Sequence, residues 1–234
     1  MKKTNGYLDK ANKDSDNVEQ YLKTVQGDIP KISRQITDLQ NVVNHGRNLT
    51  KATKQSLSSA QNDLSNGLND LQSDNNRINS LVDDMQTGGH ASSKSLLNSE
   101  INQLETLNES TLTGINNALR IADVLNNLLP NNQTTSLIRS LSNAKQHVHE
   151  QQRNLTSLKN ANQDNRSQKS INQLIKQLAK TTDALGNSLT DAGSTFTNTV
   201  SQAIDDLNDT LDTQLNGNDE VLSSLRTLLP QLNA

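Results

Sequence analysis

Apolar residues recur every seven positions from Leu8 to Met85. With Leu8 as heptad position a, ten of the twelve a positions are apolar. The a positions are Leu8, Ser15, Leu22, Ile29, Ile36, Val43, Thr50, Leu57, Leu64, Leu71, Ile78 and Met85. The d positions are Ala11, Val18, Val25, Ile32, Leu39, Gly46, Thr53, Ala60, Gly67, Asp74 and Leu81. A strict seven-residue period keeps one narrow seam turned toward a partner helix, so it predicts a left-handed coiled coil about 115 Å long.

Two irregularities interrupt this pattern. Gly27 and Pro30 lie within the heptads, and since proline removes a helical donor they predict a kink or a restart there, with Asp28 as a candidate N-cap. The d positions from Gly46 to Asp74 are small or polar while the a positions stay mostly large. That asymmetry is ordinary packing, or it marks where a third helix or another protomer docks.

Turn-forming residues divide the rest of the chain. Gly88 and Gly89 predict the tip of a helical hairpin, and Pro130 and the polar run at 160–170 are either reversals or kinks. We expect an all-α fold, an elongated antiparallel coiled coil or long helical hairpin bundle, in which 1–234 is a single elongated stalk. Its predicted parts are a long arm at 8–86, a tip turn at 87–94 and returning helices at 95–129, 134–162, 168–215 and 218–232.

Composition supports a thin seam rather than a thick core. Only 31% of the residues are hydrophobic and 1% aromatic, and aromatic side chains supply much of the burial in a thick core. Charged residues make up 20%, with a net charge of −3, which gives no basic face for nucleic acid. The polar surface is rich in amides and hydroxyls, which favours a bacterial exterior over an intracellular coiled coil rich in Glu, Lys and Arg.

The chain offers little that indicates catalysis. It has no cysteine, and the pair His147 and His149 points to different sides of a helix, so neither a metal nor a cofactor is predicted. Adjacent carboxylates such as Asp83 and Asp84 do not face each other on a helix. We therefore expect a protein that is not an enzyme. No stretch reaches the roughly 18 apolar residues of a membrane span.

Three segments carry a resemblance to a known family. They are YLDKANKDSDNVEQYLKTVQGDIPKISRQI near the start, and LGNSLTDAGSTF and LSSLRTLLPQLNA toward the end. They resemble the extracellular region of the phage infection protein (Pip/YhgE) family of Gram-positive membrane proteins, with the type VII secretion accessory protein EsaA as runner-up. The resemblance implies a helical spike between membrane segments absent from this chain, anchored at the cell surface, and members that serve as docking sites for bacteriophage.

These observations lead to one functional expectation and two alternatives. We expect a surface-exposed ectodomain that serves as a spacer and attachment surface, with a phage receptor-binding protein or a second copy of the chain as its partner. A homodimer is compatible with the seam. The candidate binding tip comprises Met85, Gly88, Gly89, His90 and Lys94. The alternatives are a type VII secretion accessory ectodomain and an intracellular or phage structural coiled coil whose role is oligomerisation.

Overall fold

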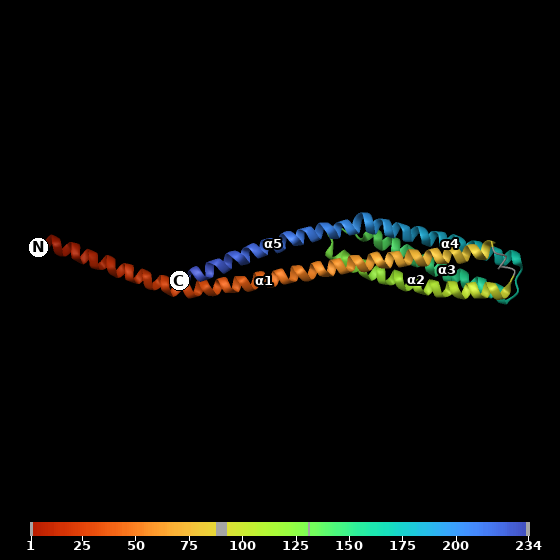
Figure 1. Cartoon of the computed structure of the whole chain (residues 1–234), viewed down its shortest axis with the longest axis horizontal. Helices are drawn as coiled ribbons and strands as arrows, with labels where there is room; N and C mark the ends of the chain where they lie inside the picture. The colour runs from red at the N-terminus through yellow and green to blue at the C-terminus, as the bar shows by residue number, and fades with distance from the viewer. Residues whose placement is uncertain (1, 88–92, 131, 233–234) are drawn as a thin grey trace. The chain divides into compact units, whose positions relative to one another are not determined.

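The chain folds entirely into helices within the part that the structure describes. The computed structural model describes residues 2–87, 93–130 and 132–232, and it contains no strand there. Figure 1 shows the helices, and the all-α fold expected from the heptads is confirmed. They are α1 (Lys2–Thr87), α2 (Lys94–Leu128), α3 (Thr135–Gln163), α4 (Gln168–Thr195), the π-helical turn η2 (Phe196–Val200) and α5 (Ser201–Leu232).

The helices group into two compact units. The first, here called the bundle unit, is Gln55–Asn208. The second, here called the arm unit, combines Met1–Lys54 with Asp209–Ala234. Helices α1 and α5 each contribute to both units, which are described separately below.

The bundle unit is an antiparallel four-helix arrangement of α1, α2, α3 and α4 (Figure 1). Cross-helix contacts show the direction of each neighbour. Hydrogen bonds link Ser110 to Asp74 (3.0 Å, α2 to α1), Lys159 to Glu105 (2.7 Å, α3 to α2) and Gln151 to Thr182 (2.8 Å, α3 to α4). A second contact in each of the later pairs, Asn162 with Asn98 and Asn154 with Thr181, shows that residue numbers rise on one helix as they fall on its neighbour. The chain therefore reverses between α2 and α3 and between α3 and α4. The reversal alternative, not the kink, is therefore the one found at Pro130 and at 160–170.

The apolar residues that recur at helical spacing on α2, α3 and α4 almost all lie in the bundle core. On α1, however, the side that packs into the core differs from the predicted seam of a and d positions. Positions a of α1, from Leu57 to Met85, are buried. The next buried set is not d but e, represented by Leu68 and Val82. Positions a and e span a wider face than a and d, as a helix with neighbours on two sides requires. The small or polar d positions are therefore only partly covered.

A layer of buried polar residues crosses the bundle core. Each of the four helices contributes one residue at about the same level: Asn75, Asn108, Gln151 and Thr182 are each no more than 2% exposed. The amide of Gln151 donates to the Thr182 hydroxyl, which donates in turn to the carbonyl of Leu178. Both amide atoms of Asn108 are buried with no hydrogen-bond partner among the described residues. The layer is thus only partly satisfied by protein groups.

The arm unit pairs one end of α5 with the middle of α1. Two ion pairs join the helices, Arg47 Nε with Asp219 Oδ1 at 2.6 Å and Lys54 with Asp212. As residue numbers rise on α1 they fall on α5, so the two helices are antiparallel. Ile36 of α1 and Leu222 of α5 are buried on this side. The arm unit therefore has a two-helix seam over part of its length.

Three predicted boundaries differ from the structure. The predicted kink or restart at 27–30 is not a restart, because α1 runs through with Pro30 inside it. The predicted break at 216–218 is absent because α5 continues through Gly217, where packing against α1 holds the helix. The predicted helix 168–215 is instead divided by the π-helical turn η2. Helix α1 also ends one residue beyond the predicted arm.

Candidate functional site

The end of the bundle unit is held together by hydrogen bonds from the first turn of α2. The ammonium of Lys94 donates to the carbonyl of Gln163 (3.1 Å) and to the side-chain oxygen of Asn165 (3.2 Å). Asn165 has a left-handed backbone, with φ of 54°, a conformation that asparagine adopts more readily than most residues. The α3–α4 turn is therefore fastened to the start of α2.

Asn162 adds a second fastening at the same end. Its buried amide donates to the carbonyl of Lys94 (3.0 Å) and to the side-chain oxygen of Asn98 (2.8 Å). Helix α4 then begins at Gln168, after the N-cap residue Ser167, whose hydroxyl accepts a hydrogen bond from the backbone N–H of Ser170. These bonds give the turn one defined shape.

The surface of this end is polar and exposed. Residues 163–169 are all exposed and carry Asp164, Arg166 and Lys169. The ion pair between Arg166 and Asp164 is 3.9 Å long and lies in solvent, so it contributes little to stability. We call Lys94 together with residues 163–169 the tip surface.

The five residues predicted for the tip differ in whether the structure describes them and in whether they are exposed. Met85 is 1% exposed and packs in the bundle core, so its side chain is not accessible to a partner. Gly88, Gly89 and His90 lie outside the described residues. Lys94 is exposed and belongs to the tip surface. Because the sequence left open whether the chain reverses at Pro130 and at 160–170, it did not predict that the α3–α4 turn lies beside Lys94.

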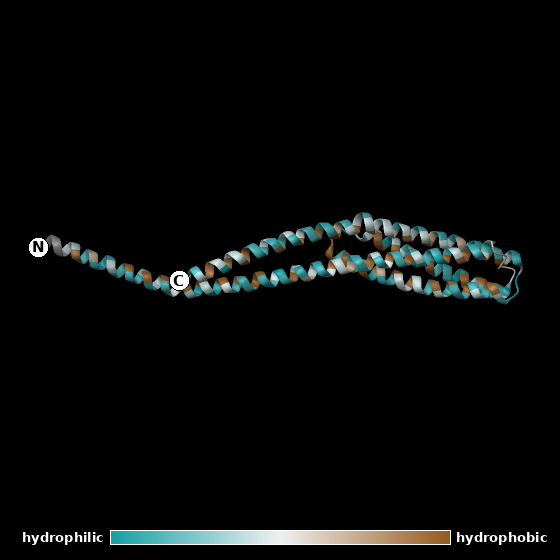
Figure 2. Ribbon diagram, viewed as in Figure 1, coloured by the Kyte–Doolittle hydropathy of each residue, from teal (hydrophilic) through white to brown (hydrophobic). Residues whose placement is uncertain are grey.

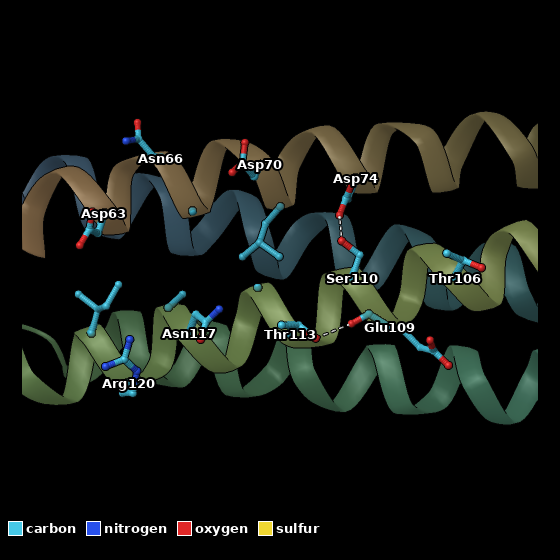
Figure 3. A pocket seen from close by; sticks show the side chains of 15 residues that line it. Asp63, Asn66, Asp70, Asp74, Thr106, Glu109, Ser110, Thr113, Asn117 and Arg120 are labelled. Atoms are coloured by element: carbon cyan, nitrogen blue, oxygen red, sulfur yellow. Dashed lines mark hydrogen bonds between the residues drawn. The ribbon is translucent and has the colours of Figure 1, made fainter.

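A second feature is a groove of about 770 Å³ between α1 and α2 of the bundle unit, shown in Figure 3. Gly67, Leu71 and Gly114 are among the residues at its base. A Cβ atom at Gly114 would lie 2.9 Å from Leu71 Cδ2, so the two helices approach closely there. The weakened d positions Gly67 and Asp74 line this groove. They therefore face a groove inside one chain, and no third helix covers them among the described residues.

The groove walls are acidic. Asp63, Asp70 and Asp74 extend from α1 and Glu109 from α2, and Arg120 is the one basic side chain lining it (Figure 3). Asp74 accepts a hydrogen bond from Ser110, and the other three carboxylates are exposed to water. No set of three or more metal-ligating His, Cys, Asp or Glu side chains gathers anywhere in residues 2–87, 93–130 or 132–232.

The two neighbouring histidines interact within their own helix. His147 Nδ1 lies 3.3 Å from Glu150 Oε2, and His149 Nδ1 lies 3.1 Å from Gln152 Oε1. A hydrogen bond from Gln146, followed by the one from His147, lowers the pKa of Glu150 below its ordinary value. The pair thus takes part in surface contacts one turn apart along α3.

Comparisons with protein-family models, with curated proteins and with solved structures found no match for this chain. No helix in the described ranges is long and apolar enough to cross a membrane.

Proposed function

We propose that the chain is a helical spacer on the exterior of a Gram-positive cell, and that its tip surface is an attachment site for a protein partner. The parent protein would be anchored by segments outside these residues. A phage receptor-binding protein is the proposed partner, on the resemblance of three sequence segments to the phage infection protein family.

The observation that supports a spacer is the architecture of the bundle unit. Its helices are 28 to 35 residues long in α2, α3 and α4, so the bundle is about 45 to 50 Å long. The buried residues form one thin apolar layer between the helices, and Figure 2 shows hydrophilic residues along every helix. Such a body separates its two ends by a fixed distance.

The observation that supports attachment at the tip is the fastening of the turn. Lys94 and Asn162 hold the backbone of residues 163–165 against α2, so the turn that presents the exposed side chains has one defined shape before any partner binds. Ordering in advance reduces the entropy lost on association. The tip surface also carries both signs of charge, which favours a polar protein partner.

Exposure on the cell surface can be tested directly. The chain has no cysteine, so Lys169→Cys introduces a single thiol at the tip surface. We expect a membrane-impermeant maleimide to label this variant of the parent protein on intact cells as fully as after lysis. Labelling only after lysis would contradict the external location and favour the intracellular coiled-coil alternative.

The attachment role needs a matched pair of variants. Arg166→Glu with Lys169→Glu reverses two charges on the tip surface, and Lys176→Glu with Lys180→Glu reverses two exposed charges farther along α4. We expect phage adsorption to cells bearing the parent protein to fall at least tenfold for the first pair only, with equal surface levels of both. Equal adsorption by the two variants would exclude the tip surface as the docking site.

A further inference from the structure

The first part of α1 carries a regular apolar seam that nothing covers among the described residues. Its a and d positions are as apolar as those of the bundle unit, yet Leu8, Val18 and Leu22 are 57% to 59% exposed. In the same heptad register, Leu64 is fully buried. Figure 2 shows hydrophobic residues recurring along this helical segment. We call residues 8–32 the open seam.

The covered part of the seam begins where α5 reaches it. In an antiparallel pair of helices with a constant register, the numbers of two facing residues always add up to the same sum. Arg47–Asp219 and Lys54–Asp212 share one sum, and by that sum Leu232 lies level with about Arg34. Burial agrees, since Ile36 is 9% exposed and Ile32 is 42% exposed. The open seam is therefore continuous, in one register, with an interface that is already formed between α1 and α5.

An isolated helix of this composition has little stability of its own. Most helical stability comes from packing an apolar face, and the segment includes Gly27 and Pro30, which disfavour the helix interior. Its intrahelical ion pairs Lys23–Glu19 and Lys31–Asp28 are exposed and worth a few tenths of a kcal/mol each. A partner on the seam supplies the missing stabilisation.

The side chains beside the seam also indicate a protein interface. Both tyrosines of the chain, Tyr7 and Tyr21, occupy heptad position g of this segment and are at least 74% exposed. Tyrosine is enriched at protein interfaces because its ring buries a large apolar area while the hydroxyl stays hydrated. Together with the a and d positions they widen the apolar face.

We propose that the open seam binds the open seam of a second copy of this chain, in an antiparallel coiled coil. The order of residue types along most of the seam disfavours a parallel dimer. Parallel dimers prefer β-branched residues at a and leucine at d, whereas Leu8 and Leu22 are at a and Val18, Val25 and Ile32 are at d, with Ile29 as the exception.

The antiparallel pairing makes the seam complementary to itself. If Val18 packs against Leu22 of the second copy, Ser15 meets Val25, Ala11 meets Ile29 and Leu8 meets Ile32. The two small residues then lie opposite β-branched ones, whereas parallel chains in register would place each small residue opposite its own copy. The pairing ends at about the level where α5 begins to cover the same face of α1, which leaves no gap in the seam.

Sedimentation equilibrium of residues 1–234 tests the association. We expect a concentration-dependent dimer between micromolar and millimolar protein, and a monomer for Val18→Asp with Leu22→Asp. The matched control, Asn17→Asp with Thr24→Asp, places the same two charges on the other side of the helix and should leave the dimer unchanged. A wild-type monomer over the whole range, or a dimer that survives the seam variant, would overturn the proposal.

Single cysteines then test the orientation. A mixture of the Val18→Cys and Leu22→Cys variants should form a mixed disulfide under mild oxidation, because these positions face each other in the antiparallel pair. Val18→Cys alone should not form one. If Val18→Cys alone forms a disulfide, and the mixture forms no more disulfide than Val18→Cys alone, the chains are parallel and the proposed pairing is rejected.

Discussion

The bundle unit and the arm unit share one heptad register along α1, but they use it differently. In the bundle, leucines at position a such as Leu57 and Leu64 are fully buried. In the arm, Leu8 and Leu22 occupy the same heptad position and are more than half exposed. A seven-residue period thus predicts that a helix has a seam, but it does not predict what covers the seam.

The physical reason is the number of neighbouring helices. In the bundle, α1 is flanked by α2 and α4, and Gly114 and Gly186 allow close approach at Leu71 and Asn75. Two neighbours bury positions a and e, so burial continues around a wide face. In the arm unit one helix, α5, covers α1 over part of its length. Stability should therefore be concentrated in the bundle.

The largest expected effect compares two leucines at the same heptad position. Leu64→Ala removes a fully buried side chain and should lower the free energy of unfolding of the bundle by about 2 to 5 kcal/mol. Leu22→Ala removes an exposed side chain and should change it by less than about 0.5 kcal/mol. Urea unfolding followed by circular dichroism, at dilute protein so that association is negligible, measures both.

Equal losses for the two leucine variants would break the comparison. That outcome would mean that Leu22 is covered within a single chain. A loss at Leu22 that grows with protein concentration would instead support the second copy on the open seam, since association stabilises the folded state by mass action.

Much of the fold could be predicted from local sequence. On 95–129 the apolar residues that recur at helical spacing are all buried, because a period near 3.6 residues directly indicates which face packs. They are Leu97, Ile101, Leu104, Ile115, Ala118, Ala122, Leu125 and Leu129. Turn-forming residues located the end of the helix at Pro130 because proline and asparagine disfavour helix continuation, but they left open whether the chain reverses or kinks there. These features depend only on neighbouring residues.

Other features could not be read from local sequence. The burial of Asn75 and Asn108 depends on which helices flank them, and their polar side chains indicate a surface position. The contact between Lys94 and Asn165 joins residues 71 positions apart. Gly217 indicated a break, but the packing of α5 against α1 overrides a single unfavourable residue. Of the two predicted tip residues that the structure describes, Met85 is buried and Lys94 is exposed.

Two glycines sharpen the comparison further. At Gly114 in the bundle, a Cβ would lie 2.9 Å from Leu71 Cδ2, and Leu71 is itself buried. Gly114→Ala should therefore cost about 1 to 2 kcal/mol, as strain exceeds the gain in helix propensity. A Cβ atom at Gly217 in the arm unit would meet no atom within 4 Å beyond the neighbouring backbone of its own helix. Gly217→Ala should therefore raise the free energy of unfolding by about 0.5 to 1 kcal/mol.

Thermal unfolding of the two glycine variants, monitored by circular dichroism, distinguishes the signs. The midpoint should fall for Gly114→Ala and rise or stay constant for Gly217→Ala. A rise for both would mean that Leu71 can change rotamer without loss, and that α1 and α2 are less tightly packed than the contact distance indicates.

The last comparison concerns the buried polar layer, a feature that the arm unit lacks among its described residues. Asn108 is 1% exposed and neither amide atom has a protein hydrogen-bond partner among the described residues. Asn108→Leu keeps the branched shape of the side chain, with a larger volume, and removes two desolvated polar atoms, so it should stabilise the bundle by about 1 kcal/mol in urea unfolding. The control is Thr182→Val, which removes the hydroxyl that accepts a hydrogen bond from Gln151. This variant should destabilise the bundle by at least as much as Asn108→Leu stabilises it. Destabilisation by both changes would mean that Asn108 is satisfied in solution. The layer would then contribute to stability as well as to the alignment of the four helices.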